Sequence, residues 1–249
     1  MLGMPTHYLR SLSGQQRRAD LNLNLARYLT FVAGAANAGG FLAVQQYTSH
    51  MSGIVASIGS NLALGHHQLV LGSLLALLSF LAGAACTAIM VNWGKRKRLH
   101  SLFALPLVLE SLLLIGFGLV GSSITTVMLL CFLMGLQNAL ITKISKTEIR
   151  TTHVTGIVTD IGIELGKLIY WNDQSLSQTE GMVLASTDKM RALFSLLSLF
   201  LLGGIVGAFG FQKVGALFTI PLAALLLVLA IVPVWDDITH SFTHPRKSP

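Results

Sequence analysis

Two histidines with matching polar neighbours are the residues of this chain whose types and spacing could do chemistry. His50 lies in TSHMSGIVASIGSNL, residues 48–62, and His153 lies in TTHVTGIVTDIGIEL, residues 151–165. Eight of the fifteen positions are identical, and Ser and Thr exchange at two more. Histidine changes its charge close to neutral pH, so it can bind an anion or carry a proton. The repeated element is therefore the first candidate for a functional site.

Each copy of the element also has the composition of a helix start. Ser52 and Thr155 are the predicted N-caps, and the glycines that follow them permit close backbone approach. Free amide groups at a helix N-terminus carry a partial positive charge and favour an anionic group. We expect substrate contacts from both elements, at His50, Ser52, Gly53, His153, Thr155 and Gly156, with Thr48 and Thr152 beside them.

A structural role is the alternative for the same residues. The histidines could simply cap the two short helices and hold the two copies together by hydrogen bonds. Glycines also form close-packing surfaces between membrane helices. On this interpretation Gly53, Gly59, Gly156 and Gly162 pack helices together and contact no substrate.

Amides precede both elements at matching positions. Asn37 follows Gly34-Ala-Ala, and Asn138 follows Gly135-Leu-Gln, so that Gln137 stands beside the second amide. Because an amide inside an apolar segment must find partners, these residues either line a pathway or bridge helices.

Acidic residues occur in the second copy of the element only. Asp160 corresponds to Ser57 and Glu164 corresponds to Asn61, and their spacing of four places the two carboxylates on one helical face. They could form a proton or cation site. For Glu164 we prefer a pairing with Lys167 near the surface, and we expect Asp160 to lie deeper.

Glu110 stands alone in the apolar segment LPLVLESLLLIGFGLV. An ionisable group at that depth either carries protons or acts as a carboxylic acid hydrogen-bonded to a neighbouring helix. The two roles are equally compatible with the sequence.

The composition indicates an integral membrane protein. Of 249 residues, 53% are hydrophobic and 11% charged, with a mean hydropathy of +0.68, whereas soluble domains carry about 25% charged residues. Long apolar stretches that could cross a hydrocarbon core of about 30 Å cover 69–93, 102–120, 124–142, 192–211 and 214–234, and a shorter one covers 28–44.

The distribution of charge argues against nucleic-acid binding, and the sequence motifs do not indicate an enzyme. The net charge of +7 is spread beside apolar segments instead of forming a patch, so it reads as a topology signal. Cys86 and Cys131 fall within predicted spans as apolar fillers. No catalytic or metal-ligand motif is present, and we expect no enzyme activity, metal or cofactor.

The basic residues decide between two topologies. Residues 52–64 would form a helix of about 20 Å, which is shorter than a membrane. If both repeated elements span, Lys and Arg divide nine to eight between the faces; if both are re-entrant, they divide sixteen to one, with Lys213 alone on the second face. The second division obeys the positive-inside rule and places both termini in the cytoplasm.

The predicted fold is all-α, with six transmembrane helices plus two re-entrant or discontinuous half-helices arranged as two inverted repeats. Transporters built in this way bind substrate at the midplane, between the repeats. The predicted parts are a cytoplasmic tail at 1–27, a first membrane repeat at 28–120, a second at 121–235 and a cytoplasmic tail at 236–249. A polar connection is expected over 171–190.

Several segments together resemble a known family. FVAGAANAGGFLAV, TSHMSGIVASIG, FLMGLQNALITK and TTHVTGIVTDIGIELGKL are similar to the bacterial YoaK family, whose members carry a domain of unknown function numbered 1275. The resemblance covers residues 28 to about 234. Members often have Asp at the position of Asn37 and Asn at the position of Ile54. The resemblance implies a multi-pass protein of the bacterial inner membrane and brings no established substrate.

From the site we expect a small transporter or channel for a small solute, more readily an anion or weak acid. Membrane lipid and a second copy of the chain, in a homodimer, are the other expected partners. The alternative is a non-transporting membrane scaffold or interaction protein, in which the repeated cluster is structural. Transport predicts a hydrated cavity reaching His50 and His153, whereas a scaffold predicts a dry, fully paired cluster.

Overall fold

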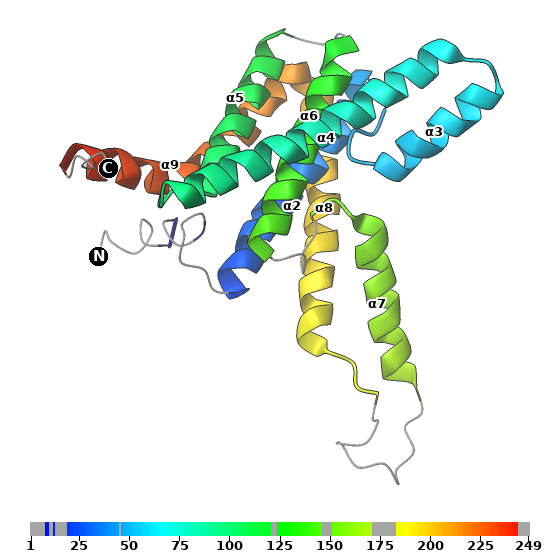
Figure 1. The fold of residues 1–249 in the computed structure, drawn as a ribbon. Helices are drawn as coiled ribbons and strands as arrows, with labels where there is room; N and C mark the ends of the chain where they lie inside the picture. The colour runs from blue at the N-terminus through cyan, green and yellow to red at the C-terminus, as the bar shows by residue number, and fades with distance from the viewer. Residues whose placement is uncertain are drawn as a thin grey trace.

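The computed structural model describes residues 8–9, 12, 19–44, 46–120, 124–145, 151–170 and 183–243. All regular structure in these ranges is helical (Figure 1). The helices are α2 Ala19–Val44, α3 Met51–Ala63, α4 His67–Arg96, α5 Ala104–Val120, α6 Ile124–Ser145, α7 Val154–Ile169, α8 Thr187–Val214 and α9 Thr219–Thr243, with a 3₁₀ turn, η1, at Gly215–Phe218.

Helices run into both predicted tails. Helix α2 begins at Ala19, ahead of the predicted repeat start at 28, and α9 continues to Thr243, past the predicted repeat end at 235. Helices extend beyond the apolar stretch when polar residues with adequate helix propensity flank it, and hydropathy does not register this extension. The predicted connection at 171–190 is too long, because α8 begins at Thr187; residues 171–182 lie outside the described ranges.

Three helical segments of the described chain are long and apolar enough to cross a membrane: His67–Arg96, Thr126–Ser145 and Thr187–Thr239. The last segment contains both α8 and α9. The chain turns between these two helices at Gly215, whose φ of 62° suits glycine. The segments Met51–Ala63 and Ala104–Leu119 are apolar but shorter. The chain thus has the helices of a membrane protein.

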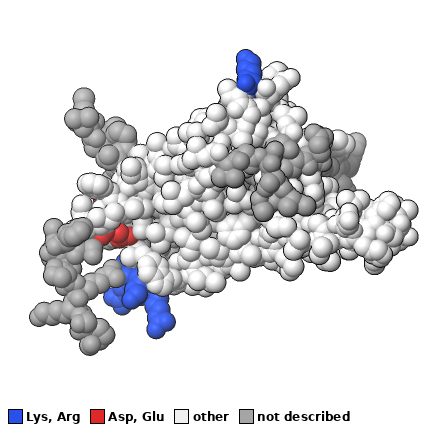
Figure 2. Space-filling view, turned by 90° about the horizontal axis from the view of Figure 1, so that it is seen from above, with Lys and Arg blue, Asp and Glu red and all other residues white. Residues whose placement is uncertain are grey.

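The surface agrees with this composition. Large apolar side chains are exposed along α4 and α8, among them Leu78, Leu81, Ile89, Leu201 and Phe209. Figure 2 shows a face on which charged groups are few and lie near its edges. Exposed apolar side chains are unfavourable in water, so such a surface suits contact with lipid.

The core is built on two close helix crossings, of α2 with α8 and of α4 with α6. A Phe-x-x-Gly sequence occurs in each of these four helices, ending at Gly34 in α2, Gly83 in α4, Gly135 in α6 and Gly203 in α8. A Cβ built on any of the four would overlap a backbone carbonyl oxygen of the facing helix. Only glycine allows the helix backbones to approach this closely.

The two crossings use equivalent residues. In the first, Gly34 faces the Phe200 carbonyl and Gly203 faces the Phe31 carbonyl. In the second, Gly135 faces the carbonyl of Phe80, and Gly83 faces the carbonyl of Phe132. Each crossing therefore joins a helix from before residue 121 to a helix from after it.

Helices α3 and α7 lie outside these crossings. They have 13 and 16 residues, or lengths of about 20 and 24 Å, which is less than the hydrocarbon thickness. In Figure 1 each begins near the central helices and points outward. Helix α3 turns back onto α4 at Gly65, where the His66 and Gly65 amides donate to the Asn61 and Leu62 carbonyls, as in a Schellman motif.

Candidate functional site

The histidines of the repeated element occupy equivalent backbone positions. His50 is the N-cap of α3, with φ −92° and ψ 71°, and His153 is the N-cap of α7, with φ −84° and ψ 60°. Neither side chain makes a capping hydrogen bond. The prediction that Ser52 and Thr155 are the N-caps is wrong, because both lie inside the first helical turn and are exposed.

The glycine three residues after each histidine makes room for the imidazole. A Cβ built on Gly53 would lie 2.6 Å from His50 Nδ1, and one built on Gly156 would overlap His153 Nδ1. Gly59 and Gly162, six residues further on, have no atom within 4 Å of a built Cβ. The His-x-x-Gly spacing thus places each imidazole over the first turn of its helix, and the atoms nearest to a Cβ on Gly53 or Gly156 belong to that imidazole.

The side-chain amides of Asn37 and Asn138 form hydrogen bonds to the loops before the two short helices. Asn37 Oδ1 accepts from the Ser49 amide at 3.2 Å and from Ser49 Oγ at 3.0 Å. Asn138 Oδ1 accepts from Thr152 Oγ1 at 2.7 Å, while its Nδ2 donates to the Met134 carbonyl at 2.8 Å. In both copies the amide therefore bridges the preceding helix and the loop that carries the histidine.

Thr48 and Thr151 are the fully buried members of the two loops. The hydroxyl oxygens of both have no hydrogen-bond partner among the described residues. The sequence prediction selected Thr48 and Thr152 as site residues, and Thr151, the equivalent of Thr48, was missed. The aligned Thr-Ser-His and Thr-Thr-His triplets contained the signal that would have selected it.

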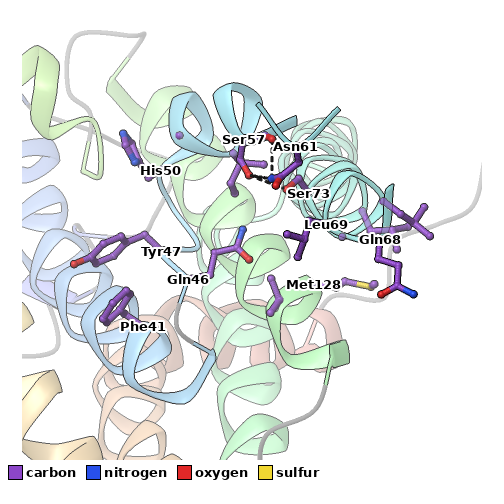
Figure 3. A pocket seen from close by; sticks show the side chains of 16 residues that line it. Phe41, Gln46, Tyr47, His50, Ser57, Asn61, Gln68, Leu69, Ser73 and Met128 are labelled. Carbon is purple, nitrogen blue, oxygen red and sulfur yellow. Dashed lines mark hydrogen bonds between the residues drawn. The ribbon is translucent and has the colours of Figure 1, made fainter. Parts of the chain in front are cut away.

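A cavity of about 740 Å³ lies beside His50. It is bounded by the end of α2, the loop before α3, α3 itself and the first turns of α4 and α6 (Figure 3). Its lining includes His50 and Gly53 of the repeated element. His153, Ser52, Asn37 and Asn138 are not among the residues that line it.

Polar side chains of α3 and α4 form one wall of the cavity. Asn61 Nδ2 donates to both the carbonyl and the Oγ of Ser57, each at 2.9 Å, and Ser57 Oγ lies 3.5 Å from Ser73 Oγ. Figure 3 shows these three side chains together on one side of the space. The sequence prediction did not select them, although a serine in the apolar α4 and the spacing of Ser57 and Asn61 were visible.

Helix α7 places its two acidic residues against the start of α8. Glu164 is 1% exposed and accepts from the Ser186 amide at 2.8 Å and from Lys167 Nζ at 3.0 Å. These donors hold the pKa of Glu164 below its ordinary value. The predicted pairing of Glu164 with Lys167 is confirmed.

Asp160 lies closer to the surface than Glu164. Its side chain is 45% exposed and lies 3.8 Å from Lys189 Nζ, which also lies 3.5 Å from Glu164. These exposures concern burial within the protein, and the expected position of Asp160 deeper in the membrane stays a prediction. The two acids join α7 to α8 through ion pairs with Lys189. Neither acid lines the cavity beside His50.

Glu110 of α5 and Gln137 of α6 form a buried pair. Gln137 Nε2 donates to Glu110 Oε1 at 2.9 Å, and both side chains are at most 1% exposed. Glu110 Oε2 and Gln137 Oε1 have no partner among the described residues. The contact to a neighbouring helix agrees with one of the two roles predicted for Glu110. Neither residue lines the cavity.

The structure thus gathers His50 and Gly53 at a cavity and leaves the other predicted site residues elsewhere. Among the described residues, no three His, Cys, Asp or Glu side chains gather as a metal site. No curated protein and no solved structure matches the chain. One family model does, over residues 25–232, and its description is "Protein of unknown function (DUF1275)". Because this match covers most of the chain, the protein belongs to the DUF1275 family.

Proposed function

We propose that this protein is a small-solute transporter or channel whose site is the cavity beside His50. The observation that carries the proposal is the cavity itself, about 740 Å³ in volume, which is lined by His50 and Gly53 of the first His-x-x-Gly element and does not reach His153. The first amides of α3 have no side-chain cap, and His50 can add a positive charge. Both features favour an anion or a weak acid.

The proposed architecture is six spans, with α3 and α7 as re-entrant half-helices and with the two halves inverted. The exchange of helices at the glycine crossings supports it, since α2 packs on α8 as α6 packs on α4. The sixteen-to-one division of basic residues supports cytoplasmic termini. A bacterial inner-membrane location is proposed from the family resemblance. We also propose a homodimer, because six spans surround a pathway only thinly.

Flux into liposomes tests the transport proposal. The purified protein is reconstituted, and uptake of labelled nitrate, sulfate and hexanesulfonate is measured; these anions stay ionised, so they do not leak across lipid as neutral acids. At least one is expected to enter faster than into protein-free liposomes. Loss of the His50 contact should slow that entry by about tenfold, the effect of one hydrogen bond to a charged group.

His66 supplies the matched control. It is an exposed histidine N-cap of α4 with φ −84° and ψ 66°, nearly the backbone of His50, and it does not line the cavity. His50→Ala should slow flux, and His66→Ala should not. Equal flux in both variants and the wild type, or no flux of any anion, would remove the support for transport.

A membrane scaffold is the second candidate. It is favoured by the hydrogen bonds of Asn37 to Ser49 and of Asn138 to Thr152, which hold loops in place. On that account His50→Ala changes no flux, and a double Asn37→Leu, Asn138→Leu variant releases a membrane partner that copurifies with the wild type.

A further inference from the structure

The cavity beside His50 has the size for an organic molecule. Its volume is about 740 Å³, whereas one water fills about 30 Å³ of the liquid. A halide or nitrate ion would therefore leave most of it empty. Cavities of roughly 300–1,000 Å³ hold ligands with a substantial carbon skeleton.

The lining is mainly apolar. In Figure 3, His50 and Tyr47 lie on one side of the cavity, and Leu69 and Met128 lie on the other. Further apolar lining comes from Ile54, Leu71, Leu75 and Val127. A ligand with a hydrocarbon body would lose contact with water against these side chains and gain affinity in proportion to the area buried.

The charge available to a ligand is limited to one side chain. Of the lining residues, all of which lie in the described part of the chain, none is Asp, Glu, Lys or Arg. Ser57, Asn61 and Ser73 bond to one another. His50 can donate a hydrogen bond when neutral and can become a cation. His50 is exposed at the edge of the cavity, and an acidic group would find its partner there, because no other lining side chain can carry a positive charge.

We propose that the cavity binds an organic monocarboxylate with a hydrocarbon body, its carboxylate beside His50 and its hydrocarbon against Leu69, Leu71 and Met128. This inference rests on the proposed function and names the solute by its chemical class. Such an acid could come from the aqueous phase as a short-chain acid or from the bilayer as a fatty acid.

Binding to a series of carboxylates tests this directly. The full chain is placed in phosphatidylcholine nanodiscs, and binding of labelled acetate, hexanoate, decanoate and palmitate is measured by equilibrium dialysis, with empty nanodiscs subtracted. Each methylene buried should strengthen binding by about fourfold until the cavity is filled. Equal affinities for acetate and hexanoate, or binding of neither, would overturn the proposal.

The chain length at which affinity stops rising distinguishes the two sources of acid. A limit near hexanoate indicates an aqueous short-chain acid, and a rise that continues to palmitate indicates a fatty acid from the bilayer. Both results support the proposed class.

Two glycines allow the cavity to be filled with a matched control. Gly72 of α4 and Gly59 of α3 both have no atom within 4 Å of a built Cβ, but Gly72 lines the cavity and Gly59 does not. Leucine favours a helix over glycine, so Gly72→Leu and Gly59→Leu should both fold. We expect Gly72→Leu to weaken hexanoate binding by at least about tenfold, the contribution of roughly two buried methylenes. Gly59→Leu should bind hexanoate as the wild type does; equal affinities in the two variants would overturn the proposal.

The carboxylate contact is tested with hexanoate and hexanol. The wild type should bind hexanoate more tightly than hexanol, and His50→Gln should remove this preference while affinity still rises with chain length. His66→Gln should keep the preference. If His50→Gln keeps it as well, the carboxylate does not bind beside His50 and the proposal fails.

The outcomes separate this inference from the transport proposal. Hexanoate binding without flux would leave the binding site intact and contradict transport. Flux of nitrate or sulfate without hexanoate binding would do the reverse. If Gly72→Leu changes the oligomeric mass in light scattering and leaves hexanoate binding unchanged, the cavity is an interface between copies of the chain, and the inference is overturned.

Discussion

At the scale of single residues, a glycine sets the position of the imidazole in each repeated element. The rings of His50 and His153 lie over Gly53 and Gly156, where a methyl group would collide with Nδ1. The same pair is found at the start of both short helices. The position of the imidazole therefore depends on residues that do not themselves carry charge.

Gly53→Ala should act on flux as His50→Ala does, by moving the ring away from the cavity. An imidazole at the helix start can rotate at little cost. The free energy of unfolding, measured by thermal unfolding in detergent, should therefore change by less than about 1 kcal/mol, close to the effect of a surface substitution. Gly59→Ala is the control, since it has open space around it. Normal flux in Gly53→Ala would show that the ring position is irrelevant.

The buried pair of Glu110 and Gln137 gives a second prediction at this scale. In Glu110→Gln the new amide can donate to Gln137 Oε1, which has no partner in the described structure, so stability should be kept. Glu110→Ala leaves the Gln137 amide unpaired and should cost about 1–3 kcal/mol. Thermal unfolding of both purified variants checks this, and an equal loss in the two would mean that the carboxylate itself is required.

At the scale of elements, the Phe-x-x-Gly crossings decide how the helices pair. Gly83 and Gly135 bring α4 and α6 together, as Gly34 and Gly203 bring α2 and α8 together. These helices carry exposed apolar side chains elsewhere, so hydrophobicity alone does not choose the partner in lipid. The close backbone contact at the glycines selects the partner helix.

Gly83→Ala should therefore destabilise the protein by about 1–3 kcal/mol, since overpacking forces the backbones apart. Gly116→Ala in α5 is the control, because a Cβ there meets no atom within 4 Å, and it should gain up to about 1 kcal/mol of helix propensity. Unfolding temperatures in the same detergent provide the measurement. A Gly83→Ala variant as stable as Gly116→Ala would refute the role of the crossing.

The sequence predicted these elements well and their packing poorly. Each predicted apolar stretch and both repeated elements contain a helix. These helices could be predicted because they depend on residues that are close together in the sequence. The crossings were missed, since the four Phe-x-x-Gly sequences only acquire meaning when helices pair. The burial of Glu164 and the exposure of Asp160 were not predicted either, because they depend on where the start of α8 lies. The cavity was likewise invisible, as five separate segments form it.

At the scale of the whole molecule, the basic residues are the basis of the proposed orientation. The basic groups of α4 at Lys95–Arg98 and those around Lys189 belong to one proposed face, and Lys213 to the other. On the proposed topology, helices α3 and α7 enter the membrane from opposite sides. The proposal therefore puts the cavity beside α3 in the half of the membrane away from the cytoplasm.

Single-cysteine labelling checks the orientation in a Cys86→Ser, Cys131→Ser background. A membrane-impermeant maleimide should label Lys213→Cys in intact cells and should label Lys97→Cys only after the membrane is opened. Both residues are exposed at helix ends, so accessibility does not differ otherwise. Labelling of Lys97→Cys in intact cells would contradict six spans with cytoplasmic termini.

The most direct measurement of the central claim is thiol block of flux through the cavity. Gly72→Cys and Gly59→Cys are introduced separately into the same cysteine-free background, reconstituted and treated with a bulky maleimide, and uptake of the fastest of the three anions is recorded. If the cavity beside His50 carries solute, the reagent stops flux in Gly72→Cys and leaves it unchanged in Gly59→Cys. Unimpaired flux in a fully labelled Gly72→Cys protein would contradict the claim.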